Sequence, residues 1–340
     1  MLLSVLDQSP IPEGSTAAEA LHNTLDLAEL ADRLGYHRYW VAEHHATPAL
    51  ACAAPEILIA AIAARTARIR VGSGGVMLPH YSPLKVAETF SLLAGLHPER
   101  IDLGLGRAPG TDPMTMLALQ RDRRQHAPDD FIEQLVELLA LLEDRLPADH
   151  PFTRLARTLP GRPERPEPWL LGSSPQSAIW AGELGLPYSF ADFINPAGAA
   201  IASDYRTRFL ASERLGAPHV SVGVIAVCAE SDEEAERLAS SSRMMLSLLR
   251  QGRLVEIPPV EKALRYLETR TPRPTGRRAV IGSPATVRTG LEAVASEYEA
   301  EEVVVLTITH SHEARRRSYE LIASEFGLSA PPSTSVTTAR

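Results

Sequence analysis

The 340-residue sequence has few of the residues and segments that mark several common classes of protein. Two cysteines, Cys52 and Cys228, are too few for a disulfide framework or a thiolate zinc site. With 34 Lys+Arg against 42 Asp+Glu the net charge is −8, which argues against a dedicated nucleic-acid binder, because such proteins need a basic face. No signal-peptide pattern opens the chain, and Pro55 and Glu56 interrupt the apolar stretch at 49–64. We therefore expect a cytoplasmic protein with no metal, nucleic-acid or membrane partner.

Motifs for two widespread kinds of catalysis are also missing. The sequence has no G-x-S-x-G elbow and no P-loop, which argues against α/β-hydrolase and kinase chemistry. The run GLGRAPG at 104–110 does not have the spacing of a dinucleotide fingerprint. A hydrophobic content of 44% and a charged content of 22% nevertheless indicate a folded globular protein.

Short apolar or β-branched runs alternate with helical patterns along the chain. The first helix, at 16–34, opens with a capping box formed by Thr16 and Glu19 and stops at Gly35. Prolines stand where later helices begin, as at Pro55 and Pro83. The strands that precede these helices are predicted at 2–7, 38–43, 68–73, 100–106, 168–172, 187–192, 219–227 and 302–309.

Eight strand–helix units predict an α/β fold in which a parallel sheet closes into a (β/α)8 barrel, with an open doubly wound sheet as the alternative. We expect one barrel domain at 1–326. An insertion at about 240–282 separates the seventh and eighth strands and has helical patterns at 240–250 and 260–269. Such an insertion is either a lid or a surface excursion. The composition of 327–340 predicts a disordered tail.

Candidate site residues follow from the rule that a barrel has its active site at the C-terminal ends of its strands. The first strand is followed by Gln8 and Ser9, the second by Glu43, His44 and His45, and the third by Gly74, Gly75, Met77, His80 and Tyr81. The fourth strand is followed by Arg107, Ala108 and Pro109, and the fifth by Ser173, Ser174 and Ser177. The sixth is followed by Asp192 and Asn195, and the eighth by His310 and His312.

The sequence LGSSPQSA is the clearest ligand signal, because it runs from a strand end into a helix N-terminus. Hydroxyls at Ser173, Ser174 and Ser177, together with backbone N–H groups and the helix dipole, suit a phosphate. The basic Arg107 at a neighbouring strand end adds to this reading. The alternative is that Ser174 merely caps the helix.

Two further patterns carry weaker signals. The pair Gly74-Gly75 permits unusual dihedrals and close approach to a flat ligand, or marks an ordinary bulge. His44 and His45 cannot both face the site as strand residues, because neighbours on a strand alternate. A hydrogen-bonding or acid/base histidine is favoured over a metal ligand here.

Several segments together resemble the bacterial luciferase-like, flavin-dependent monooxygenase family, in the family's order. They are SVLDQSPI, GYHRYWVAEHH, IRVGSGGVMLPHYSPLKVAETFSLL, RIDLGLGRAPG and LLGSSPQSAIWAGELGLPYSFA, within 4–192, followed by VIGSPATV at 280–287. WVAEHH is more similar to the FMN-using branch than to the deazaflavin-using branch. The resemblance implies a barrel, a homodimer and FMN, which a separate NAD(P)H flavin reductase delivers in the reduced form. Reduced FMN would react with O2 to give a 4a-hydroperoxide that oxygenates a small organic substrate.

The same resemblance implies roles for individual residues. It implies that His44 is the catalytic acid/base and that Gly74-Gly75 forms a non-proline cis peptide behind the flavin ring. Arg107 would contact the flavin, and Ser174 and Ser177, with Ser173 adjacent, would bind its phosphate. Luciferases proper have an acidic residue at the position of Ser173, and the 240–282 insertion does not resemble their mobile loop, so luminescence with a long-chain aldehyde is not implied.

Two rival functions and a substrate pocket complete these expectations. The nearest rival is a deazaflavin-dependent hydride-transfer oxidoreductase on the same barrel, and the other is a non-catalytic flavin-binding protein. The substrate pocket is expected among the loops after strands one, three, six and eight and the insertion. Its candidate residues are Gln8, Ser9, Met77, His80, Tyr81 and Asp192.

Overall fold

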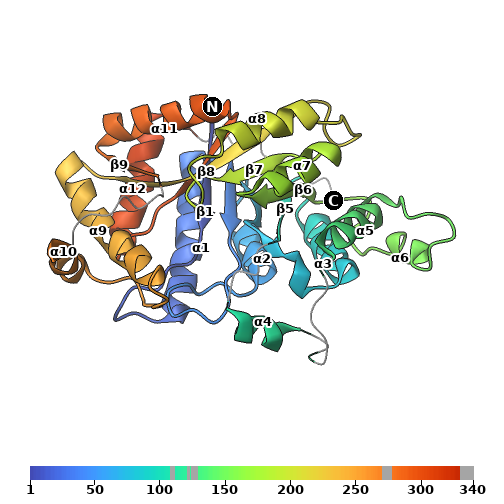
Figure 1. Ribbon diagram of the computed structural model, residues 1–340, viewed down its shortest axis with the longest axis horizontal. Coiled ribbons are helices and arrows are strands. Elements are labelled where there is room, and N and C mark those ends of the chain that lie inside the picture. Colours follow the sequence, from blue (N-terminus) through green and yellow to red (C-terminus); the bar gives the residue numbers. More distant parts are fainter. Residues whose placement is uncertain (108–111, 121–122, 124–128, 270–277, 330–340) are drawn as a thin grey trace, which may run out of the picture.

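A closed barrel of eight parallel strands forms the centre of the molecule (Figure 1). The computed structural model describes residues 1–107, 112–120, 123, 129–269 and 278–329. The barrel closes because β10 pairs with both β1 and β8. This confirms the (β/α)8 barrel and excludes the open sheet. In order around the barrel the strands are β1 (Leu2–Asp7), β2 (Arg38–Val41), β3 (Arg70–Ser73), β5 (Ile101–Gly106), β6 (Glu167–Gly172), β7 (Tyr188–Ala191), β8 (Val220–Cys228) and β10 (Glu302–Leu306).

Helices follow the strands at the positions that their start signals predict. The Thr16–Glu19 capping box opens α1, and Gly35 ends it with a φ of 88°. Pro55, Pro83 and Pro175 each stand at the start of a helix. The helices that pack around the barrel are α1 (Ala17–Leu34), α2 (Pro55–Arg65), α3 (Pro83–Leu96), α5 (Phe131–Glu143), α7 (Pro175–Glu183), α8 (Ala199–Arg208), α11 (Pro284–Tyr298) and α12 (His312–Glu325).

Additional elements lie in the connections between these units. β4 (Val76–Met77) pairs with the end of β5, and the short helix η1 (Leu78–His80) follows it. α4 (Pro113–Leu119) comes after β5, and α6 (Thr153–Ala156) lies in the Pro-rich segment before β6. None of the described helices is long and apolar enough to cross a membrane.

The long connection between β8 and β10 contains α9 (Asp232–Leu249), α10 (Val260–Glu268), β9 (Ala279–Gly282) and α11, and α9 and α10 lie together at one side of the barrel (Figure 1). The helical patterns at 240–250 and 260–269 fall on α9 and α10. β9, which pairs with Ile225–Cys228 of β8, was not predicted. Residues 270–277 of the predicted insertion and 330–340 of the predicted tail lie outside the described residues.

The two faces of the barrel wall have different compositions. Side chains such as Val5, Tyr39 and Leu103 point outward and form the main core with the helices. Leu6, Trp40, Trp169 and Val304 belong to a separate apolar cluster inside the barrel. The alternation along each strand produces this division, because successive side chains point to opposite faces.

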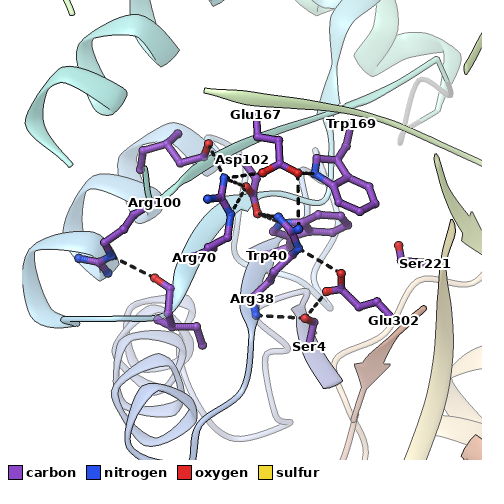
Figure 2. A network of polar contacts seen from close by, with 12 residues as sticks. Ser4, Arg38, Trp40, Arg70, Arg100, Asp102, Glu167, Trp169, Ser221 and Glu302 are labelled. Atoms are coloured by element: carbon purple, nitrogen blue, oxygen red, sulfur yellow. Dashed lines mark hydrogen bonds and ion pairs between the residues drawn. The ribbon is translucent and has the colours of Figure 1, made fainter. Parts of the chain in front are cut away.

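A network of charged side chains fills the N-terminal end of the barrel interior (Figure 2). Arg38 donates to Asp102 at 2.8 Å and to Glu302 at 3.1 Å, and Arg70 also pairs with Asp102. Although burial opposes its ionisation, the neighbouring His219 and the charge of Arg38 lower the pKa of Glu302 to about 2. These groups therefore remain charged and closely paired beneath the apolar interior.

Candidate active site

Two adjoining cavities lie at the C-terminal ends of the barrel strands, where a barrel has its active site. We call them the Ser174 cavity, of about 450 Å³, and the His44 cavity, of about 520 Å³. Both volumes are in the range of small-molecule sites. Phe193 and Ile194, which follow β7, contribute to the walls of both cavities. Ligands in the two cavities would therefore be neighbours.

The N-terminus of α7 forms one end of the Ser174 cavity, where Ser173, Ser174 and Ser177 all contribute to the lining. Ser174 stands at the N-cap, but its side chain makes no capping hydrogen bond. The Ser177 hydroxyl donates to the Ser174 carbonyl at 2.8 Å and lies 3.0 Å from the Tyr188 hydroxyl. The simple capping role considered for Ser174 is therefore not what the structure shows, and the helix N-terminus stays open to an anion.

Arg107 extends the basic character of this end of the cavity. It directly follows β5, is exposed, and contributes to the cavity lining. Its guanidinium lies 5.6 Å from the ring centroid of Trp180, which is on α7. Trp180 in turn packs against Phe131 of α5, with ring centroids 5.4 Å apart. The structure thus places a cation in the same cavity as the helix N-terminus, as expected for a phosphate site.

Glycines form a flat stretch of the wall in the same cavity. The Gly74-Gly75 peptide is cis, as the family resemblance implies. Gly106, at the inward-facing end of β5, also lines the cavity. A Cβ added at Gly106 would meet nothing nearer than the Val76 carbonyl oxygen at 3.9 Å, so any longer side chain there would extend into the cavity. The shape suits a flat ligand.

Trp40 supports this wall from inside the barrel. Its indole Nε1 donates to Asp102 at 2.9 Å, and its ring packs edge-on against Trp169 (Figure 2). An added Cβ on Gly74 would lie 3.1 Å from the Cβ of Trp40. The charged network at the N-terminal end therefore fixes the side chain on which the glycine wall rests.

The His44 cavity combines an apolar floor with two histidines. Buried apolar side chains of β8, α9 and the β10 end, including Ile225, Met245 and Leu306, line it. Both His44 and His45 contribute to the lining, contrary to the expectation that only one could face the site. The physical reason is that β2 ends at Val41, so the alternation of a strand no longer applies at 44–45.

The two histidines differ in their surroundings. Burial, and to a smaller extent the neighbouring His45, together lower the pKa of His44 to about 4, so His44 is neutral at pH 7. His45 Nε2 lies 2.7 Å from the buried carboxylate of Glu43. That carboxylate also accepts from the Tyr81 hydroxyl at 2.7 Å and from the Met77 N–H at 2.9 Å. Glu43 therefore ties the loop after β2 to the loop after β3.

Comparison with known proteins agrees with this geometry. The family model of luciferase-like monooxygenase matches residues 1–299. A luciferase-like monooxygenase of Escherichia coli is 42% identical over 94% of this chain and 95% of its own length. The N-acetyl-S-alkylcysteine monooxygenase of Bacillus subtilis is 39% identical over 94% of this chain and 97% of its own length. The chain belongs to the luciferase-like monooxygenase family.

Solved structures show the same similarity between this chain and the luciferase-like monooxygenase family. The crystal structure of apo-MsnO8 is 42% identical, with a TM-score of 0.89, and the match covers 96% of this chain and 98% of that one. A type II Baeyer–Villiger monooxygenase component of Pseudomonas putida, in complex with FMN, has a TM-score of 0.73 over 96% of this chain and 97% of that one. At 20% identity, the latter likeness shows the shared fold alone.

Only some of the residues predicted for the substrate pocket line the two cavities. Gln8 lines the His44 cavity, and Met77 lines the Ser174 cavity. Asp192 is buried away from both, where it pairs with Arg278 at 2.8 Å and accepts from Tyr298. Ser9, His80 and Tyr81 also contribute to neither lining; Ser9 is buried beneath α1 with Thr24. These four residues do not form the pocket expected for them.

Several lining residues were not singled out from the sequence. Trp40 and Trp180 are large aromatic residues within a predicted strand and a predicted helix. An aromatic residue inside such an element does not by itself indicate that it lines a cavity. Phe193 directly follows the predicted candidate Asp192 and could have been included by the strand-end rule. Ala108 and Pro109, which the sequence also indicates, lie outside the described residues.

Proposed function

We propose that this protein is an FMN-dependent monooxygenase that uses reduced FMN and O2 to oxygenate a small organic substrate. The observation that carries the proposal is the pair of adjoining cavities at the barrel mouth. One has a flat glycine wall and an anion-binding end, and the other has an apolar floor and a neutral histidine. This division suits a cofactor and a substrate held side by side.

The residues of the Ser174 cavity fit FMN. Ser174 and the α7 N-terminus would hold the phosphate, with Arg107 as the countercharge. Gly106 leaves room on the wall for the isoalloxazine, and Trp40 and Leu6 supply apolar surface from inside the barrel. When bound, reduced FMN supplies the reaction with O2, through the flavin 4a-hydroperoxide that the family resemblance implies.

His44 would act as the acid/base residue on the substrate side of the site. Because its ring is neutral at pH 7, it can donate a hydrogen bond from one nitrogen and accept at the other. The apolar residues around it, such as Leu306 and Ile308, exclude water from the reacting atoms. Because these surroundings are apolar, the local dielectric constant is low, and each hydrogen bond that the His44 ring makes is strengthened.

The proposal also covers the setting in which the enzyme works. Reduced FMN would come from a separate NAD(P)H flavin reductase, and the working form would be a homodimer in the cytoplasm. A deazaflavin-dependent hydride transfer and a non-catalytic flavin-binding role are the rival outcomes of the experiments below. The family of the chain, with monooxygenases among its relatives, supports oxygenation over both.

The placement of the phosphate can be tested by comparing FMN with riboflavin. Ser174→Ala and Arg107→Gln are each expected to weaken FMN binding about tenfold, because each removes a partner of a charged group. Riboflavin, which has no phosphate, should bind both variants as it binds the wild type. Flavin fluorescence titration measures these affinities, with Ser203→Ala on the exposed face of α8 as the matched control. Equal losses for FMN and riboflavin would contradict this placement.

A further inference from the structure

The mouth of the His44 cavity has one cation whose side chain is uncommitted within the described part of the chain. Arg253 contributes to the cavity lining, is exposed, and makes no side-chain hydrogen bond or ion pair with any described residue. The other charged or titratable residues in the lining are His44, His45 and Asp112. His44 is neutral at pH 7, and His45 is paired with Glu43.

The carboxylate of Asp112 is also part of the lining, but its hydrogen bonds hold it at the start of α4. Asp112 is the N-cap of α4, where it accepts from the backbone N–H groups of Met114 and Thr115 and from the Thr115 hydroxyl at 2.6 Å. No ion pair joins it to Arg253 in the described structure. Among the described lining residues, Arg253 therefore supplies the one guanidinium that is free to bind a ligand, and the Asp112 carboxylate remains engaged at the start of α4.

The backbone holds Arg253 in a defined place. α9 ends in a turn in which Gly252 has a φ of 71° and the Arg253 N–H donates to the Leu248 carbonyl at 3.0 Å. Four residues later, Ile257 is fully buried and exchanges hydrogen bonds with the backbone of Ile11 and Glu13. The segment that carries the cation is thus anchored at both ends, to α9 and to the loop after β1.

From these contacts we propose that the substrate is an amphipathic organic acid, with a carboxylate bound by Arg253 and an apolar arm on the cavity floor. This inference rests on the proposed function and names its substrate class. A planar guanidinium pairs bidentately with a carboxylate. A single cation suits one negative charge better than the two of a phosphate. The arm would lie against Ile225, Met245 and Ile308, which are buried and apolar.

The test measures binding of matched acids and amides by isothermal titration calorimetry, with FMN present. The probes are hexanoate, octanoate and 4-phenylbutyrate, each beside its primary amide. The wild type should bind acids about tenfold more tightly than amides, and salt should weaken acid binding alone. Arg253→Gln should abolish this preference, and Arg253→Lys should retain part of it. Arg250→Gln, a charge removed from the same segment outside the cavity, should retain it fully.

Three results would overturn the inference: equal binding of acid and amide by the wild type, an unchanged preference in Arg253→Gln, or no binding of any probe. Reduced FMN binding is measured on the same wild-type preparation. If reduced FMN binds while acids and amides behave alike, the substrate class is wrong and the proposed function stands. If reduced FMN does not bind, the proposed function fails whatever the acids do.

Discussion

Replacing His44 by alanine is expected to lower the rate of substrate oxygenation about 10²- to 10⁴-fold, the range for loss of a positioned proton-transfer group. The ring lines the cavity proposed for the substrate and is neutral at pH 7. Its loss leaves the apolar floor and the Ser174 cavity in place, so reduced FMN binding should change little. Stopped-flow mixing with aerated buffer measures the lifetime of the oxygenated flavin, which should shorten in the variant. His22→Ala, on the exposed surface of α1, is the control.

The pH dependence gives a second readout of the same residue. Because burial lowers the pKa of His44 to about 4, a rate limited by its neutral form should fall near pH 4 and not near 6.5. The unfolded chain binds this proton below about pH 6.5, so the wild type should lose stability relative to His44→Ala as the pH falls toward 4. Urea unfolding at pH 7 and pH 5 measures the difference. An acid limb near 6.5 that His44→Ala abolishes would contradict the buried neutral ring.

Replacing Asp102 by alanine is expected to destabilise the protein by about 3–5 kcal/mol, because it leaves buried charges uncompensated. Asp102 is fully buried and accepts from Arg38, Arg70 and the indole of Trp40 (Figure 2). A loss of this size is a large share of the 5–15 kcal/mol by which typical domains are stable. Trp40 would also lose its orientation, so FMN should bind more weakly to whatever fraction remains folded.

Glu167 supplies the matched control for this network. It also faces Arg38 and Arg70, but its side chain is 40% exposed, so water can replace it. Glu167→Gln should therefore cost about 1 kcal/mol or less. Asp102→Asn, which keeps an acceptor oxygen, should fall between the two. Equal urea midpoints for Asp102→Ala and Glu167→Gln would show that the buried network does not hold the barrel together.

The barrel could be predicted from the sequence because its signals are local. Alternating apolar runs predicted all eight barrel strands, and Thr16, Pro55 and Pro83 marked helix starts. α4 was missed because none of its residues is buried, so it carries no amphipathic pattern. β9 and α11 were missed because β9 has only four residues and lies within the last part of the predicted 240–282 insertion, and α11 follows it directly.

The candidate site, like the fold, could be predicted from the sequence only where its signals are local. The strand-end rule located Gly75, Arg107 and Ser174, which do converge on one cavity. The pairing of buried groups depends on contacts far apart in sequence, and no local pattern predicts it. Asp192 was selected by its place after a strand, yet Arg278, 86 residues away, holds it in an ion pair. The insertion that contains Arg253 was expected to contribute to the substrate pocket, but the strand-end rule does not single out any residue within it.

The most direct measurement of the central claim is an anaerobic titration of the protein with reduced FMN, followed by mixing with aerated buffer. Our account predicts tight binding of reduced FMN and a long-lived oxygenated flavin spectrum that decays faster in His44→Ala. If reduced FMN does not bind, or reoxidises as fast as free flavin in both proteins, the monooxygenase assignment is contradicted. Tight binding of the reduced deazaflavin under the same conditions would then identify the hydride-transfer alternative.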